Sequence, residues 1–266
     1  MSRAIILSLG LSLIVAPRTV AEAPDTVFLE ALTWTEVREA VRSGKTTIIL
    51  PTGGTEQNGP HMALGKHNAR ARSLAEEVAR ALGNALVAPV LAYVPEGQVS
   101  PPTGHMRFPG TITVPDDVFQ KLIESAARSF RLHGFRDIVF LGDHGSTQPG
   151  QRAVAARLNR EWASTPVRVH AVEEYYRASD VEFPRLLLAR GYSQQEIGRH
   201  AGLADTSLML AMDPSLVRVA RLGREGGGDD GTDGDPRRAS AELGRLGAAL
   251  VVSRTVDAIK AATSRR

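Results

Sequence analysis

The fold of this chain is decided by the stretch Leu50-Pro-Thr-Gly-Gly-Thr-Glu56-Gln-Asn-Gly-Pro-His61-Met-Ala-Leu-Gly-Lys-His67-Asn. The apolar run that leads into it from Thr46 predicts a buried strand ending in a glycine-rich turn. Glu56 and two histidines follow within twelve residues. Because α/β proteins place ligand sites where parallel strands end, and because Glu and His both bind metals, this stretch predicts a metal site. The alternative is a polar surface loop.

Two later segments carry further candidate residues. The run from Asp137 to Leu141 predicts a second short strand, which is followed by a glycine and then by His144. Taken alone, His144 fits a hydrogen-bonded loop histidine as well as it fits a metal ligand. His200 and Asp205 stand five residues apart before an apolar run of helical spacing. Asp205 could be the N-cap of that helix, a role that does not exclude a part in chemistry.

Predicted strands and helices alternate along the rest of the chain. Helical patterns cover 68–82, 116–133, 150–162, 207–212 and 238–260. Extended apolar runs cover 86–94, where Pro89 breaks the run, and 167–172. Ser193 to Glu196 has the spacing of a capping box. Strands separated by helices form parallel sheets with both faces covered. We therefore expect an α/β fold, a three-layer α/β/α domain with a mainly parallel sheet. Glu56 and His144 should both lie just past strand ends, and residues 22–266 should form one domain.

Composition excludes several classes of protein. The 266 residues are 42% hydrophobic and 23% charged, which is enough for one domain with a large buried core. The formal net charge is +3 and the basic side chains are spread out rather than gathered in a block, so nucleic-acid binding is not expected. Cysteine is absent, which excludes disulfides, thiol catalysis and thiolate metal sites.

The N-terminus has the pattern of an export signal. Arg3 precedes an uncharged apolar stretch from Ala4 to Ala16, and small residues follow at Ala21 and Ala23. Thirteen apolar residues are too few for an ordinary membrane span. We expect residues 1–21 to be a signal peptide and the mature protein to be periplasmic or secreted. The alternative is an N-terminal helix of a cytoplasmic protein.

Five blocks occur in order between Leu32 and Lys260. They are Thr55-Glu56-Gln57-x-Gly59-Pro60-His61, Phe108-Pro-Gly110-Thr111-Ile112, Gly142-x-His144-Gly145, His200-Ala-Gly202-x-x-Asp205-Thr-Ser207 and Gly231-x-x-Gly234-Asp235-Pro236. In these blocks the chain resembles the creatininase (creatinine amidohydrolase) family of metal-dependent hydrolases. The resemblance covers nearly all of the chain after residue 21, and it implies a creatininase-like α/β/α fold with a metal centre.

The chain also departs from this family at three metal-ligand positions. The family usually has a second-metal histidine at the position of Asn58 and an aspartate that bridges both metals at the position of His67. Creatininase itself has a second-metal glutamate at the position of Ser146. An imidazole ligates one metal and bridges two cations poorly. The surviving set, Glu56, His67 and His144, predicts a mononuclear site, with Zn2+ expected and Mn2+ or Fe2+ as alternatives.

The resemblance implies an amidohydrolase that cleaves a carbon–nitrogen bond in a small cyclic or linear amide. Family members open lactam-like rings, remove formyl groups or cut small peptides. The proton-transfer groups are then His200 and Asp205. The expected substrate contacts are His105, Gly110 and Thr111, which resemble the family's active-site rim, and Tyr175 and Tyr176 at the end of a strand. A structural role fits His105 equally well.

Other functions fit the same residues. A single Lewis-acid metal also serves a lactonase or an isomerase of a small polar substrate. Loss of the second metal also fits a non-catalytic protein that binds a small molecule. The resemblance implies a homo-oligomer, with the hexamer as the family's common form. No nucleic-acid partner is expected, and no membrane partner once residues 1–21 are removed.

Overall fold

A four-stranded parallel sheet forms the centre of the protein, whose computed structural model describes residues 24–223 and 230–264. The strands are β1 (Thr47–Thr52), β2 (Ala85–Val87), β3 (Asp137–Gly142) and β4 (Arg168–Ala171). Their order in the sheet is β2-β1-β3-β4, and every neighbouring pair is parallel. The register pairs Thr47 with Asp137 and Thr52 with Gly142, so β1 and β3 end side by side. The predicted α/β/α architecture is confirmed.

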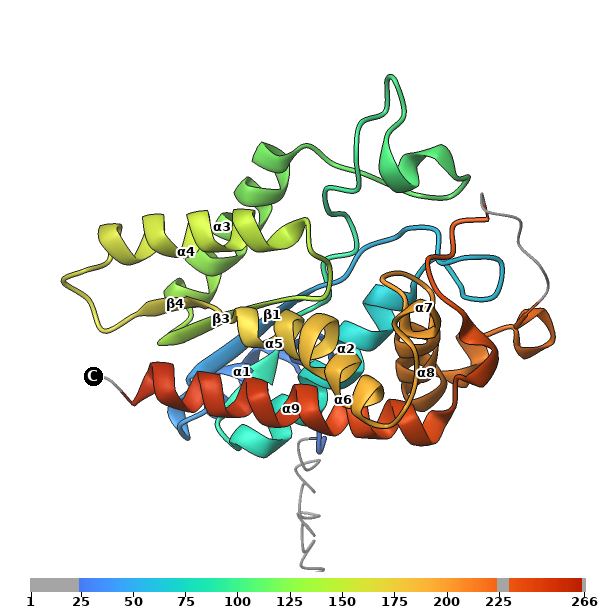
Figure 1. The fold of residues 1–266 in the computed structure, drawn as a ribbon. Helices are drawn as coiled ribbons and strands as arrows, with labels where there is room; N and C mark the ends of the chain where they lie inside the picture. The colour runs from blue at the N-terminus through green and yellow to red at the C-terminus, as the bar shows by residue number, and fades with distance from the viewer. Residues whose placement is uncertain (1–23, 224–229, 265–266) are drawn as a thin grey trace, which may run out of the picture.

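Successive side chains of β1 point to opposite faces of the sheet, and each face packs against its own apolar core. Ile48 and Leu50 face a core built with helices α3 (Asp116–Leu132) and α4 (Thr147–Glu161). Ile49 faces the opposite core, built with α2 (Lys66–Leu82), α8 (Leu203–Met212) and α9 (Ala241–Thr263). Figure 1 shows α3 and α4 on one side of the sheet and α9 on the other. Both faces are covered, which explains why all six residues of β1 are buried and why its middle, Ile48 to Leu50, is apolar without alternation.

Shorter helices complete this frame. Helix α1 (Trp34–Arg42) begins with a capping box between Thr33 and Glu36, a feature that the sequence analysis did not single out. The predicted capping box at Ser193 is present and begins α7 (Gln194–Ile197). The segment after β4 is helical throughout and consists of α5 (Glu173–Arg177), a π-helical turn (Ala178–Glu182) and α6 (Phe183–Ala189).

One predicted strand is shorter than its apolar run. The run 86–94 was expected to be extended, but only Ala85–Val87 joins the sheet as β2. Pro89 has no N–H to donate to a neighbouring strand, and the chain then continues through single bridges, such as the one between Thr52 and Leu91. The predicted signal peptide, residues 1–21, lies outside the described residues. No helix within the described ranges is long and apolar enough to cross a membrane.

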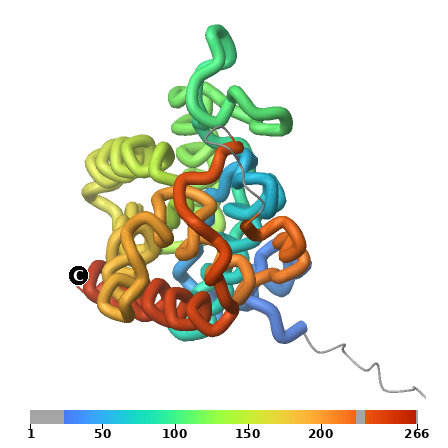
Figure 2. Tube along the Cα trace, turned by 45° about the vertical axis from the view of Figure 1, so that its right-hand side comes forward, coloured from blue at the N-terminus to red at the C-terminus, as the bar shows by residue number. Residues whose placement is uncertain are grey.

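The segment between β2 and α3 leaves the body of the protein and returns to it. It projects from the sheet in Figure 1 and Figure 2 and carries the 3-10 turn Gly104–Arg107. Two bridges attach it to neighbouring chain segments, one between Thr55 and Ile112 and one between Val94 and Thr113. This attachment places the segment beside the loop that follows β1, where the candidate site lies.

Candidate metal centre

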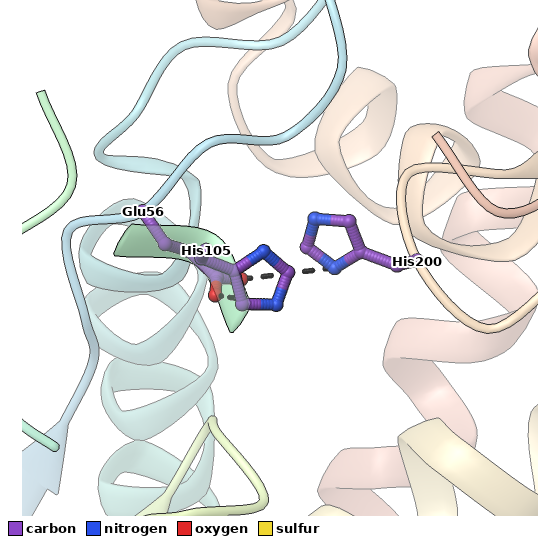
Figure 3. A group of neighbouring side chains, drawn as sticks. All are labelled: Glu56, His105 and His200. Atoms are coloured by element: carbon purple, nitrogen blue, oxygen red, sulfur yellow. Dashed lines mark ion pairs between the residues drawn. The ribbon is translucent and has the colours of Figure 1, made fainter. Parts of the chain in front are cut away.

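Glu56 is the common member of two histidine groups. It lies just past the end of β1 and is fully buried. Its carboxylate, the Nε2 of His67 and the Nε2 of His144 form one group that could hold a metal ion, and Glu56, His105 and His200 form the other. Figure 3 shows the second group, with both imidazoles directed at the Glu56 carboxylate. The five side chains come from four separate chain segments that meet at the carboxyl edge of the sheet.

The first group contains the three residues predicted as metal ligands. His67 Nε2 lies 2.7 Å from Glu56 Oε1, and His144 Nε2 lies 3.0 Å from Glu56 Oε2. His67 enters from the first turn of α2, and His144 follows the end of β3. Burial raises the pKa of the Glu56 carboxyl, but hydrogen bonds from His144 and His67 outweigh burial and hold that pKa well below its ordinary range. Glu56 is therefore an anion.

Asp143 determines which nitrogen of His67 carries a proton. The Asp143 carboxylate lies 2.6 Å from His67 Nδ1, and it also accepts hydrogen bonds from Arg70 Nε and from the Tyr175 hydroxyl. Burial works against ionisation, but Arg70 and His67 lower the pKa of Asp143, so the carboxylate is charged and only accepts. Nδ1 must then donate, and Nε2, which donates to Glu56, is the nitrogen that could bind a metal in place of its proton.

In the second group, Gln57 holds both histidines by hydrogen bonds. The Gln57 side-chain oxygen accepts from the Gly59 N–H, and its amide nitrogen donates to the carbonyl of Gly231 and to His105 Nδ1. His105 Nδ1 is therefore an acceptor, and the proton sits on Nε2, 3.2 Å from Glu56 Oε2. His200 donates from Nε2 to the backbone carbonyl of Gln57, 2.9 Å away. Its Nδ1 is left free, 3.7 Å from Glu56 Oε1.

His200 is a neutral imidazole at neutral pH. Burial and the nearby charge of Lys66 lower its pKa to about 4, against the opposing effect of Glu56. The rings of His105 and His200 lie close together, with their centres 4.5 Å apart. Burial also lowers the pKa of His105. Of the two imidazoles, only His200 presents a lone pair toward Glu56.

Asp205, the second predicted proton-transfer group, is held by two cations. Its oxygens lie 3.0 Å from Lys66 Nζ and 2.7 Å from Arg70 Nη1, and it accepts from the Ala201 N–H. Burial would raise its pKa, but Lys66 and Arg70 hold it well below the ordinary value. The N-cap of α8 is Gly202, so Asp205 is not at the N-cap position but lies within the first turn. Its carboxylate positions Lys66, which is fully buried.

A pocket of about 220 Å³ opens at this cluster. Seven predicted site residues line it: Glu56, His67, His105, His144, Tyr176, His200 and Asp205. Gly110, Thr111 and Tyr175 do not line this pocket. Thr111 instead accepts a hydrogen bond from the Gln57 N–H, and Tyr175 is buried against Asp143. A role of these three residues in substrate binding stays a prediction.

Asn58 and Ser146, two of the residues that differ from the family pattern, form local hydrogen bonds. The Asn58 side chain donates to the carbonyls of Glu56 and Ala63 and so braces the turn after Glu56. The Ser146 hydroxyl lies 2.7 Å from His144 Nδ1, and the Ser146 N–H lies 3.2 Å from the same atom. The Ser146 N–H donates to His144 Nδ1, which is therefore an acceptor, and His144 Nε2 carries the proton that faces Glu56.

The sequence analysis missed four polar residues of this site: Lys66, Arg70, Glu96 and Asp143. Two of them carried a usable signal. Lys66 and Arg70 are one helical turn apart and flank His67, so a helix that begins at residue 66 places them on one face. Glu96 had no such signal, because it follows an irregular segment with no motif. It is buried beside Glu56, and burial together with the Glu56 charge raises its pKa to about 10.

The fold and this cluster define an α/β protein with a candidate metal centre at the carboxyl edge of its sheet. The family model for creatinine amidohydrolase, Creatininase, matches residues 30–259. The chain therefore belongs to the creatininase family.

Known relatives of the chain are hydrolases. A creatinine amidohydrolase of Pseudomonas putida is 28% identical over 200 residues, which cover 74% of this chain and 76% of the relative. A 3-dehydro-scyllo-inosose hydrolase of Thermotoga maritima is 26% identical, and the match covers 74% of this chain and 59% of the relative. A mycofactocin precursor peptide peptidase of Mycolicibacterium smegmatis is 27% identical, with 80% of this chain and 84% of the relative covered.

A solved structure agrees with the fold. The crystal structure of a creatinine amidohydrolase (creatininase) superposes with a TM-score of 0.75 at 26% identity, and the match covers 91% of this chain and all of the other. The resemblance stated from the sequence blocks is thereby confirmed.

Proposed function

We propose that this protein is a metal-dependent amidohydrolase that cleaves a carbon–nitrogen bond in a small cyclic or linear amide. The observation that carries this proposal is the convergence of Glu56, His67 and His144 in one polar pocket. Two relatives support it by their activities, because one is an amidohydrolase and another is a peptidase.

The donor set fits one divalent cation. His67 Nε2 and His144 Nε2 both face the ionised Glu56 carboxylate and can act as ligands once a cation displaces their protons, while Asp143 accepts a hydrogen bond from His67 Nδ1. This is the hydrogen-bond support that metal-bound histidines usually have. When bound there, a metal supplies a Lewis acid that polarises a carbonyl and lowers the pKa of water. Solved creatininases are described with manganese and as a Zn–Zn type, so Zn2+ or Mn2+ is the expected ion.

The histidines on the other side of Glu56 suit proton handling. His200 is neutral, and its free Nδ1 can take a proton and later deliver it to a leaving nitrogen, while its Nε2–H stays on the Gln57 carbonyl. His105 presents an Nε2–H that can donate to a substrate oxygen. Lys66, held by Asp205, adds a positive charge to the same wall of the pocket.

The pocket limits the substrate to a small polar molecule. Its volume of about 220 Å³ lies below the range typical of drug-sized ligands. Its wall carries imidazole, carboxylate and cationic groups, including Lys66, Arg70 and Arg199. A short amide with hydrogen-bonding groups on both sides of the scissile bond suits such a wall better than a long apolar chain does.

Metal analysis followed by a substrate screen tests this proposal. The purified protein, equilibrated with Zn2+ or Mn2+ and then dialysed, should retain one tightly held equivalent. It should hydrolyse a cyclic amide or an N-formyl compound in a panel that also contains lactones. His67→Ala should lose both metal and activity, whereas His133→Ala, at the exposed end of α3, should keep both. Failure of the unmodified protein to retain any metal would overturn the proposal.

A second candidate is hydrolysis of a substrate other than an amide. The Thermotoga maritima relative is a 3-dehydro-scyllo-inosose hydrolase, so a related site serves a different substrate class. Turnover of lactones or cyclic polyol derivatives, with no turnover of any amide in the panel, would favour this candidate.

Export and self-association of the protein are further proposals. We propose that residues 1–21 direct export and that the mature chain forms a homo-oligomer. N-terminal sequencing of the mature protein should begin at residue 22. Light scattering at micromolar concentration should give a mass of several subunits. An intact N-terminus and a monomeric mass would contradict the two proposals in turn.

A further inference from the structure

Glu96 is a buried carboxylate without a hydrogen-bond partner. Its side chain has no exposed surface. Neither of its oxygens has a hydrogen-bond partner among the described residues. An unpaired carboxylate in a protein interior carries a large free-energy cost, which is usually relieved by a partner, by protonation or by a metal. Glu96 therefore lies buried and unpaired beside the cluster where a cation is expected.

The Glu96 carboxylate lies against His144, one of the proposed metal ligands. Its Oε2 lies 3.0 Å from His144 Nε2, without the geometry of a hydrogen bond, and Glu56 Oε2 lies at the same distance from that nitrogen. His144 Nε2 is thus approached by two carboxylates. Three donor atoms that crowd together in this way match the ligand shell of a cation better than they match hydrogen bonding, because one imidazole N–H can serve only one of the two carboxylates well.

The backbone holds Glu96 in this position. Its N–H donates to the Thr113 hydroxyl, which in turn donates to the carbonyl of Gly97. These two bonds tie the outgoing and returning parts of the segment between β2 and α3 together. On the other side, Oε1 packs against Gly54, where an added Cβ would lie 2.5 Å from that oxygen. Gly54 also has a φ of +153°, which other residues rarely adopt. The carboxylate is seated against backbone rather than left to move.

We propose that Glu96 is a further ligand of the cation held by Glu56, His67 and His144. This inference rests on the proposed function, because it requires that a metal binds there. Two carboxylates would then balance the charge of a divalent ion, and the ligand set would contain two imidazoles and two carboxylates. Added carboxylate oxygen shifts a site toward harder ions, so the set favours Mn2+ relative to a site built from Glu56 and the two histidines alone.

Glu96→Gln tests this inference, since the amide has the same shape and is a much weaker ligand. We expect Zn2+ and Mn2+ affinities, measured by competition with a chelator, to fall by about tenfold or more, the scale seen when support around a metal site is lost. A tenfold loss removes about 1.4 kcal/mol of metal-dependent stabilisation. The metal-free variant should melt at the same temperature as the metal-free parent, because the amide fills the same space as the carboxyl group. Glu174→Gln, on the exposed surface of α5, is the control that should change neither quantity.

The outcomes separate this inference from the proposed function. If the unmodified protein binds no metal, the proposed function fails and Glu96 is not a ligand. If the unmodified protein binds metal and Glu96→Gln binds it as tightly, only the inference is overturned. If the protein holds two equivalents and Glu96→Gln holds one with unchanged affinity, Glu96 is a ligand of a second ion and not of the one held by Glu56, His67 and His144, which overturns the inference. Lower melting temperature of the metal-free variant, with unchanged metal affinity, would make Glu96 structural and overturn it.

Discussion

The two sides of Glu56 contain the same ligand types and differ in what holds their histidines. On one side, His67 donates from Nδ1 to the Asp143 carboxylate, and its Nε2 could bind a metal in place of its proton. On the other side, His105 accepts at Nδ1 from the Gln57 amide, and its Nε2 must carry a proton. Both sides are carboxylate–histidine–histidine groups by residue type. Their chemistry differs because of the second hydrogen bond that each imidazole makes.

This contrast teaches that ligand identity alone does not define a metal site. Both groups bring three donors together, but His67 would keep a proton on Nδ1 if its Nε2 bound a metal, whereas His105 would have to lose its single ring proton. The nitrogen that carries the proton is set by an anion, Asp143, in His67 and by an amide, Gln57, in His105. The first is fixed by Arg70 and Tyr175, and the second by the Gly59 N–H and the Gly231 carbonyl.

Removal of Glu56 should have the largest effect, because it is the residue common to both groups. Glu56→Gln is expected to lose bound metal and to reduce turnover to the background rate. Metal analysis after dialysis and a turnover assay measure the two losses. Full metal retention in this variant would mean that the imidazoles and Glu96 suffice, and that the two sides do not depend on a shared carboxylate.

His200→Ala should separate chemistry from metal binding. Because proton transfer by a positioned group typically contributes about 10²–10⁴-fold to rate, turnover should fall by that order with metal content unchanged. His105→Ala is the companion variant and should also keep its metal, since the proton on Nε2 prevents ligation there. Loss of metal in either variant would place an ion on the His105–His200 side and reverse the assignment of the two sides.

Asp143→Asn should weaken metal binding without removing a ligand. The amide cannot hold His67 Nδ1–H as a charged carboxylate does, so metal affinity should fall by about 10–100-fold. Tyr175→Phe keeps the carboxylate and removes only one of its donors, and its effect should be below tenfold. Chelator competition measures both. Equal affinities in Asp143→Asn and the parent protein would show that the tautomer of His67 is set by something other than Asp143.

Ser146→Ala should have the smallest effect in this series. It removes one neutral hydrogen bond to His144 Nδ1, which contributes about 0.5–1.5 kcal/mol. Metal affinity should fall severalfold at most, with the same melting temperature for the metal-free protein. A loss as large as that of Asp143→Asn would mean that His144, rather than His67, is the histidine whose orientation limits binding.

The fold could be predicted from the sequence because its signals are local. The apolar runs of β1 and β3 predicted two strands, and the helical spacing before Gly83 predicted α2, whose C-cap glycine has a positive φ. The prediction was less complete at two other elements. Pro89 shortened β2, and the helical segment after β4 was missed because its short pieces lack a clear apolar period.

The site could be predicted only where a motif marked it. Glu56, His67 and His144 were found because each stands next to a strand end or within a family block, and the structure brings them together. Asp205 was assigned to proton transfer by its block, whereas its contacts with Lys66 and Arg70 depend on how α8 packs against α2. Glu96 lies in an irregular segment, and only the pairing of Val94 with Thr113 brings it to the cluster.

The wide separation in sequence of the contacts around Glu56 has a consequence for how the protein acquires its metal. Glu56 and His67 are 11 residues apart, but His144 is 88 residues from Glu56, and Gln57 and His200 are 143 apart. Chain-closure entropy makes such contacts late in folding, so the unfolded chain has no site that could select an ion. If residues 1–21 export the chain before it folds, the ions present in the compartment where folding finishes determine which metal is loaded, ahead of any preference of the completed site.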